Sequence, residues 1–282
     1  MPWLFNALKR TRTSTGCYSH QHLKLARLPI PPPARWGFGF YHGKHPLATV
    51  ESSKMETKNL NINEIFLSIQ GESTMAGLPC VFIRLRGCPL RCRYCDTSYA
   101  FSEGTGITID EIITQVQQYQ CMLVEVTGGE PLLQPNVHDL MVRLCDLDYS
   151  VLVETSGQQP IGVCDPRVRR IVDIKTPNSG AGGSFLQANY EQLCEKDEVK
   201  FVITDREDFD WALHVVEANT LLEIACAVHF SPVMQQDGNG CIEGCPALSP
   251  EVLAEWILES GKNIRLHMQL HRYVWAPDTR GV

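Results

Sequence analysis

The stretch GCPLRCRYCDTSYAF, residues 87–101, places three cysteines within eight residues. Thiolates in the spacing CxxxCxxC, here Cys88, Cys92 and Cys95, can hold zinc or an iron–sulfur cluster. Structural zinc takes four protein ligands, and the only other close pair, Cys241 and Cys245, fits a shared helix face or loop better than a second metal site. A four-iron cluster on three cysteines leaves one iron open. The loop therefore predicts a metal centre that can bind a further ligand.

From residue 81 onward, short apolar runs alternate with amphipathic segments. This alternation indicates parallel strands joined by helices. We expect strands at 81–87, 121–126, 150–154, 169–175, 198–204, 225–230 and 264–270. We expect helices at 108–119, where Thr108 and Glu111 form a capping box, at 136–147, around Trp211, and at 249–260. The fold class is α/β. A partial or complete (β/α) barrel is the preferred architecture, and an open doubly wound sheet is the alternative.

Unusual polar residues follow most of these strands. In parallel α/β folds the carboxyl ends of the strands form the active face, so residues from separate strands should meet at one mouth. The segments are Gly87–Cys88, Thr127–Glu130, Glu154–Gly157, Asp173–Lys175, Ser231–Pro232, and Gln269 with His271. The pattern predicts one active site beside the cysteine loop.

The cysteine loop, with Tyr94 before the last cysteine, resembles the cluster loop of radical S-adenosylmethionine enzymes. TGGEP at 127–131 strengthens the resemblance and counts against a zinc loop. The resemblance implies a short, modified partial barrel and a [4Fe–4S] cluster on Cys88, Cys92 and Cys95. It also implies that the open iron binds S-adenosylmethionine, whose one-electron cleavage yields a radical that abstracts hydrogen from a substrate. The cofactor would supply the difficult chemistry.

Residues 63–97, NEIFLSIQGESTMAGLPCVFIRLRGCPLRCRYCDT, are similar to the 7-carboxy-7-deazaguanine synthase family, and the similarity extends to about residue 276. Ser73 replaces a usual glycine, and DIKTP at 173–177 differs from the SPK of many members. The family converts 6-carboxy-5,6,7,8-tetrahydropterin to 7-carboxy-7-deazaguanine with loss of ammonia, in queuosine and 7-deazapurine biosynthesis. The resemblance therefore implies a carbon–nitrogen lyase.

The same resemblance implies three groups of site residues. Those expected at S-adenosylmethionine are Tyr94, Cys95, Asp96, Gly129, Glu130, Ser156, Asp173, Ile174, Lys175, Phe230, Ser231, Pro232 and Val233. Those expected at the pterin are Ile69, Gln70, Gly71, Arg84, Thr127, Glu154, His271 and Pro277. Thr97 is the expected ligand of Mg²⁺, a hard cation that uses few protein oxygens.

The residue types suit these roles. A pterin has a donor–acceptor edge like that of guanine, which the Gln70 amide or the Glu154 carboxylate can pair with. Arg84 can bind a planar carboxylate with two hydrogen bonds. Structural alternatives stay open: Arg84 can serve in an ion pair, His271 in the core, and Thr97 as a cap of the loop.

Composition narrows the possible partners. The 282-residue chain carries a net charge of -7, which argues against a nucleic acid partner or an anionic membrane surface. No apolar run approaches the length of a membrane span. We expect a soluble, cytoplasmic enzyme acting on a small molecule. The resemblance also implies that a flavodoxin-like or ferredoxin-like protein supplies one electron at a time, and that the enzyme is a homodimer.

The N-terminal region differs in composition from the rest. Residues 1–55 contain eight Lys and Arg against the single acid Glu51, together with a proline run at 31–33. We expect an unstructured extension at 1–55 and a catalytic domain at 56–282. A targeting segment or a partner-binding arm are the alternatives. Met55 could also be the natural start.

Two other functions remain open from the sequence. A glycyl-radical-enzyme activase shares CxxxCxxC and GGEP but acts on a protein, so Arg84 and Gln70 would be dispensable in it. A noncatalytic iron–sulfur protein needs no open iron, so its cluster would not respond to S-adenosylmethionine.

Overall fold

The computed structural model describes residues 58–276 and 279–282, all within the unit Lys54–Val282. The predicted extension at 1–55 and the predicted contact Pro277 lie outside the described residues.

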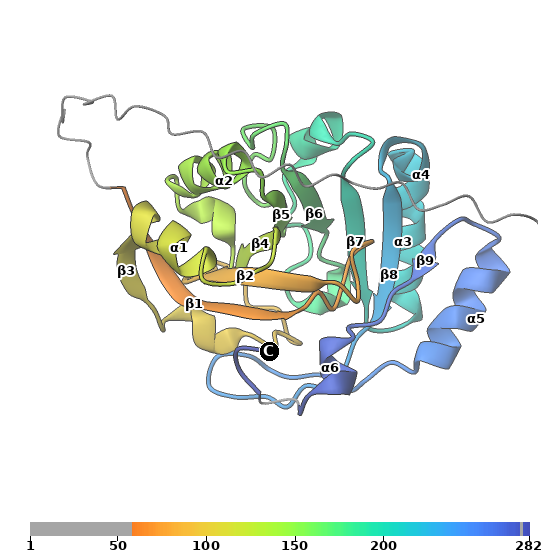
Figure 1. The fold of residues 1–282 in the computed structure, drawn as a ribbon. Helices are drawn as coiled ribbons and strands as arrows, with labels where there is room; N and C mark the ends of the chain where they lie inside the picture. Colours follow the sequence, from red (N-terminus) through yellow and green to blue (C-terminus); the bar gives the residue numbers. More distant parts are fainter. Residues whose placement is uncertain (1–57, 277–278) are drawn as a thin grey trace, which may run out of the picture. The chain divides into compact units, whose positions relative to one another are not determined.

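One mixed sheet of nine strands organises this unit, in the order β3-β1-β2-β4-β5-β6-β7-β8-β9. Strand β1 is antiparallel to β2 and β3, whereas every pairing from β2 to β9 is parallel. Within the described residues the two edge strands do not pair, so the sheet is open (Figure 1). The strands are β1 Asn59–Ile69, β2 Pro79–Leu85, β3 Thr105–Thr108, β4 Leu123–Gly128, β5 Ser150–Thr155, β6 Arg169–Asp173, β7 Glu198–Ile203, β8 Ala227–Pro232 and β9 Arg265–Leu266.

Helices connect most of the parallel strands, as the alternating pattern predicts, but the β5–β6 connection contains no helix and the β6–β7 connection only 3-10 helices. The α-helices are α1 Ile109–Val116, α2 Val137–Asp146, α3 Arg206–Ala218, α4 Leu221–Ile224, α5 Pro250–Ser260 and α6 His271–Val274. Helix α1 begins with the predicted capping box between Thr108 and Glu111. Short 3-10 helices lie at Ser98–Phe101, Pro131–Leu133, Pro177–Ser179 and Gln187–Gln192. Among the described residues, no helix is long and apolar enough to cross a membrane.

The two faces of the sheet have different chemistry. One face packs its alternate apolar residues, such as Ile83, Val126 and Phe201, against the helices in a single core. The alternate positions Arg84, Thr127 and Lys200 line a cavity on the other face. Because side chains alternate along a strand, the same elements build both the core and a polar interior. The preferred architecture is thus confirmed as a partial barrel rather than a complete one.

The strand predicted at 264–270 is shorter in the structure. Only Arg265 and Leu266 form β9, beside β8. His271, expected to close that strand, is the first residue of the short helix α6. The chain leaves the sheet early because its polar residues are used elsewhere: His267 Nδ1 lies 3.0 Å from Ser231 Oγ, and Gln269 donates to Glu72.

Candidate active site

A cavity of about 200 Å³, open to solvent, lies at the carboxyl ends of the parallel strands. It brings together most of the residues predicted from the sequence. Those that line it are Ile69, Gln70, Gly71, Arg84, Cys88, Cys92, Tyr94, Cys95, Asp96, Thr97, Thr127, Gly129, Glu154, Ser156, Asp173, Lys175, Val233 and His271.

The cysteine loop follows β2 directly and presents all three thiols to this cavity. Arg91 fixes the loop by donating to the carbonyls of Cys88 and Leu90, at 2.8 and 2.7 Å. The three cysteines are free thiols, and burial raises the pKa of Cys95 to about 12. Burial likewise raises the pKa of the Cys88 and Cys92 thiols. Iron must therefore displace protons when it binds, as metals bound to thiolates do.

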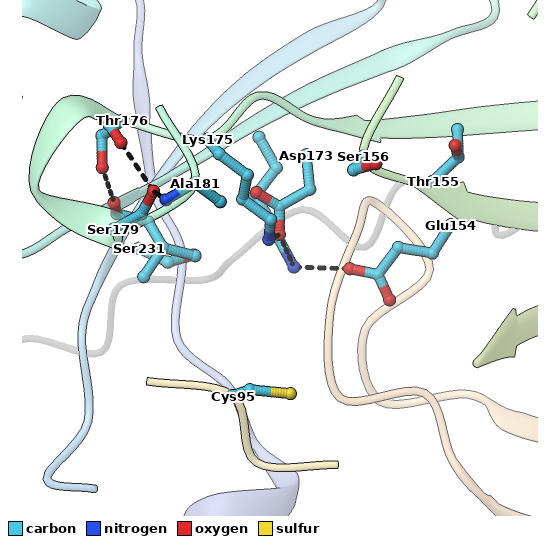
Figure 2. A network of polar contacts seen from close by, with 12 residues as sticks. Cys95, Glu154, Thr155, Ser156, Asp173, Lys175, Thr176, Ser179, Ala181 and Ser231 are labelled. Carbon is cyan, nitrogen blue, oxygen red and sulfur yellow. Dashed lines mark hydrogen bonds and ion pairs between the residues drawn. The ribbon is translucent and has the colours of Figure 1, made fainter. Parts of the chain in front are cut away.

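Two orphaned polar atoms in the cavity wall suit a bound ligand. The Tyr94 hydroxyl and Asp173 Oδ1 are buried and have no hydrogen-bond partner among the described residues. Buried polar atoms normally have partners, so an adenosine-like ligand with several donors and acceptors would satisfy this wall. Lys175 lies nearby, 2.9 Å from Asp173 Oδ2 and with its ammonium 5.7 Å from the centre of the Tyr94 ring. Figure 2 shows Asp173, Lys175 and Glu154 pointing toward the same space, with Cys95 on a separate segment.

The donor set fits a cluster better than a single ion. Among the described residues, no three His, Cys, Asp or Glu side chains converge as ligands of one metal ion. Cluster cysteines bind separate irons and need not meet at one point. The three thiols on one cavity wall, beside the orphaned polar atoms, fit a cluster with a small-molecule ligand.

The turn after β4 packs directly against the cysteine loop. A Cβ added at Gly129 would lie 2.2 Å from the Gly87 oxygen and 2.7 Å from Cys88 Cβ, so only glycine allows this approach. The Glu130 carboxylate, predicted as an acceptor for an ammonium of the ligand, makes its hydrogen bonds within the chain. Glu130 is fully buried and accepts hydrogen bonds from Thr155 Oγ1, Ser156 N and Ser156 Oγ at 2.6 to 2.8 Å. It joins the ends of β4 and β5 behind the cavity wall.

Other residues predicted at S-adenosylmethionine also lie behind the wall. The side chains of Ile174 and Phe230 belong to the apolar core on the helix-covered face. The Ser231 hydroxyl contacts His267, and Pro232 ends β8 without lining the cavity. These four residues do not line the cavity, whereas Val233 does.

The segment after β1 forms the opposite wall. The Gln70 amide, predicted to face a pterin, donates to Glu125 Oε2 at 2.5 Å and accepts from Glu72 N at 3.0 Å. Its side chain thus holds two cavity-lining residues in place. Arg84 donates through Nε to Glu64 at 2.8 Å. No hydrogen bond from its terminal guanidinium nitrogens is formed within the described residues, although Arg84 lines the cavity.

The chain end closes one side of the cavity. A Cβ on Gly71 would lie 2.4 Å from His271 Nδ1, so the predicted residues from both ends of the domain do meet. His271 Nε2 lies 3.8 Å from Asp96 Oδ2. Burial lowers the pKa of His271, but Asp96 and Glu72 outweigh that effect and raise it.

Thr97 sits at the start of the 3-10 helix that follows the cysteine loop. Its side chain makes no capping hydrogen bond there, and its hydroxyl oxygen is 3.8 Å from Cys95 Sγ. It lines the cavity, so the hydroxyl is available to a ligand.

Sequence reasoning missed several polar residues of the cavity wall, among them Glu72, Glu125 and Lys200. Glu125 and Lys200 lie inside the strands LVEVTG and EVKFVI, and an ionisable residue within an apolar parallel strand is a signal that could have found them. Burial, followed by the charge of Glu154, raises the pKa of the Glu125 carboxyl well above its ordinary range. Glu72 lies two residues after Gln70 in the IQGE segment.

Comparison with known proteins identifies the family. A model of the radical SAM superfamily matches residues 82–177. The chain is 45% identical over 226 residues to the 7-carboxy-7-deazaguanine synthase of Chlorobaculum tepidum, covering 79% of this chain and 97% of that protein. The corresponding protein of Koribacter versatilis is 43% identical over 226 residues, covering 79% of this chain and 100% of that protein. The chain belongs to the 7-carboxy-7-deazaguanine synthase family.

The fold comparison agrees with this family assignment. The crystal structure of QueE from Escherichia coli superposes with a TM-score of 0.61 at 24% identity, covering 76% of this chain and 95% of that one. The radical S-adenosylmethionine fold predicted from the cysteine loop is therefore confirmed. As a member of this superfamily, the protein is an enzyme that uses a [4Fe–4S] cluster and S-adenosylmethionine.

Proposed function

We propose that the protein is a 7-carboxy-7-deazaguanine synthase, which contracts the ring of 6-carboxy-5,6,7,8-tetrahydropterin with loss of ammonia. It would act as a carbon–nitrogen lyase in a pathway to queuosine and related 7-deazapurines. The observation that carries the proposal is the single cavity, in which the cysteine loop faces a wall of carboxylates, amides and arginine. The family relatives bear the name of this activity.

Cys88, Cys92 and Cys95 would hold the cluster, and Tyr94, Asp173 and Lys175 would contact S-adenosylmethionine. When bound, these groups supply one-electron cleavage of the sulfonium and hydrogen abstraction from the substrate. The chain's own contribution is to orient both molecules in one cavity and to exclude side reactions. The orphaned Tyr94 hydroxyl and Asp173 oxygen give that contact a physical reason.

The opposite wall would bind the pterin. The terminal nitrogens of Arg84 suit the substrate carboxylate, since a guanidinium binds a carboxylate with two parallel hydrogen bonds. The Glu154 carboxylate, with Thr127 Oγ1 3.5 Å away, suits the amino and lactam N–H groups of the pyrimidine edge. Gln70 would act mainly by fixing Glu125 and Glu72, because its amide is already bonded to both.

Thr97 would bind Mg²⁺ together with the substrate carboxylate and water. The hydroxyl lines the cavity and makes no capping bond, which supports this role. Mg²⁺ keeps several waters and needs few protein ligands. The Thr97→Ala protein should keep full iron content but lose most of its stimulation by Mg²⁺ in an anaerobic assay. Equal stimulation of both proteins would contradict the assignment.

A direct test separates this function from that of an activase. The reconstituted enzyme, given S-adenosylmethionine, reductant, Mg²⁺ and carboxytetrahydropterin under anaerobic conditions, should release 7-carboxy-7-deazaguanine, identified by mass. Cofactor cleavage without that product would overturn the proposal. A flavodoxin-like or ferredoxin-like reductant, a homodimer and a cytoplasmic location stay predictions from the resemblance.

A further inference from the structure

Lys200 lines the cavity, and none of the roles predicted from the sequence was assigned to it. It is in the middle of β7, pairs in register with Asp173 of β6 and His229 of β8, and is only 3% exposed. A buried ammonium is costly unless charged partners surround it. Its position in a six-residue strand of buried residues therefore demands a specific set of partners.

Three carboxylates from three separate elements supply that set. Lys200 Nζ lies 2.5 Å from Glu72 Oε2, 2.5 Å from Glu154 Oε1 and 3.1 Å from Asp173 Oδ2. The ammonium donates hydrogen bonds to Glu72 and Glu154 and forms an ion pair with Asp173. Glu72 follows β1, Glu154 lies on β5 and Asp173 ends β6. One side chain thus ties the proposed pterin wall to the proposed S-adenosylmethionine wall.

The charges explain what the ammonium does for these acids. Burial raises the pKa of Glu154 above its ordinary value, and the charge of Lys200 limits that rise. For Glu72, the charges of Lys200, His267 and His271 outweigh burial and lower its pKa. Without Lys200, the carboxylate of Glu154 would lie near those of Glu72 and Asp173 with no ammonium between them. The negative charges of these two neighbours would then disfavour its ionised form. The other ionisable groups that act on this cluster are Glu125, Tyr94, Lys175, His267 and His271.

We propose that Lys200 is a positioning residue that holds Glu154 ionised and correctly oriented to accept hydrogen bonds from the pyrimidine edge of the pterin. The inference rests on the proposed function. A protonated carboxyl has lost part of its acceptor capacity and becomes a donor, which mismatches the amino and lactam N–H groups of the pterin. Lys200 thereby sets the lower pH limit of substrate binding.

The test measures binding rather than turnover. The dissociation constant of carboxytetrahydropterin is measured by anaerobic calorimetry on the reconstituted protein with Mg²⁺ and without S-adenosylmethionine, from pH 6 to 9. An opposite charge at this distance lowers a carboxyl pKa by about one to three units. In Lys200→Met, binding at pH 7 should therefore weaken about tenfold or more and recover as the pH rises. Lys200→Arg, which keeps the charge, should keep the pH dependence of the unaltered protein.

Two further variants isolate the cause. Lys200→Met/Glu154→Gln should bind weakly but lose the pH-dependent step, because the titrating carboxyl is gone. Lys262→Met is the matched control, since Lys262 pairs with Glu217 at an exposed position, and it should bind like the unaltered protein.

Several results would overturn the inference. One is a Lys200→Met protein that retains iron and has an unchanged affinity and pH profile. Another is a Lys200→Arg protein in which the pH-dependent change in affinity is shifted. The third is a double variant in which that pH-dependent change survives. If Lys200→Met does not fold, Lys200→Arg and Glu154→Gln test the inference instead. The pH-dependent change in affinity should remain in Lys200→Arg and vanish in Glu154→Gln. An unaltered protein that neither binds nor converts the pterin would overturn the proposed function itself, and this inference with it.

Discussion

At the scale of single residues, Glu130 of the TGGEP turn joins the ends of two neighbouring strands through its buried carboxylate. The carboxylate accepts bonds from Thr155 and Ser156 and, at 3.2 Å, from Leu132 N. Glu130→Gln replaces one acceptor oxygen with a donor in a fully buried site, so it should lower the free energy of unfolding by about 2–4 kcal/mol. Urea unfolding under anaerobic conditions measures this, with exposed Glu207→Gln as the control. Equal losses in both variants would contradict the role.

Gly129 gives a second prediction at this scale. Gly129→Ala would place a methyl group against the Gly87 oxygen and Cys88 Cβ, so it should push the cysteine loop away from the turn. We expect iron content after reconstitution to fall severalfold. Gly240→Ala, where no atom lies within 4 Å of the added Cβ, should load iron normally. Full iron loading of Gly129→Ala would show that the close approach is unnecessary.

Sequence reasoning at this scale succeeds where a short motif carries the function. Cys88, Cys92, Cys95 and Gly129 could be placed because their spacing is characteristic. Lys200 and Glu125 could not, since their meaning depends on partners that only the folded sheet brings near.

At the scale of elements, β7 depends on its first residue. Glu198 is fully buried and accepts bonds from Thr74 at 2.6 Å and Arg169 at 3.3 Å, and it lies 2.8 Å from His229 Nε2. Burial raises its pKa, but bonds from His229 and Thr74 outweigh burial and hold the pKa at about 2 rather than 4.5. Glu198 thus ties β7 to β8, β6 and the segment after β1.

The pH dependence follows from the sign of that shift. A carboxyl with a depressed pKa stabilises the fold above its ordinary pKa and loses this contribution as the pH falls toward 2. The free energy of unfolding of the unaltered protein should therefore fall on the order of 2–3 kcal/mol more than that of Glu198→Gln between pH 5 and pH 2. Chemical denaturation at several pH values measures both curves. Parallel curves would exclude Glu198 as a source of acid sensitivity.

The strands that the sequence predicts well are those in which the run of apolar residues corresponds to the buried positions. Strands β4 to β8 are apolar runs in a sheet interior, and their predicted bounds agree closely with the structure. The final run 264–270 alternates apolar and polar residues and lies at an edge with one neighbour, and only two of its residues pair there. Strands β1 and β3 lie before and after the cysteine loop and were not predicted, since they leave the βαβ pattern and pair antiparallel.

At the scale of the whole molecule, the relatives match about four-fifths of the chain and are themselves matched almost completely. We therefore expect a chain beginning at Met55 to fold, to load iron and to turn over like the full chain. Thermal unfolding, iron content and the anaerobic assay compare the two. A large loss in the shorter chain would assign residues 1–54 a part in the catalytic unit.

The central claim is that one cavity joins radical chemistry to a pterin substrate, and one anaerobic reaction tests it most directly. 5′-Deoxyadenosine and 7-carboxy-7-deazaguanine are quantified together in the unaltered protein and in Arg84→Met. We predict that the unaltered protein forms both molecules. Arg84→Met should cleave the cofactor with little product, because the substrate carboxylate loses its guanidinium partner. Cofactor cleavage without deazaguanine in the unaltered protein, or full product formation by Arg84→Met, would contradict the account.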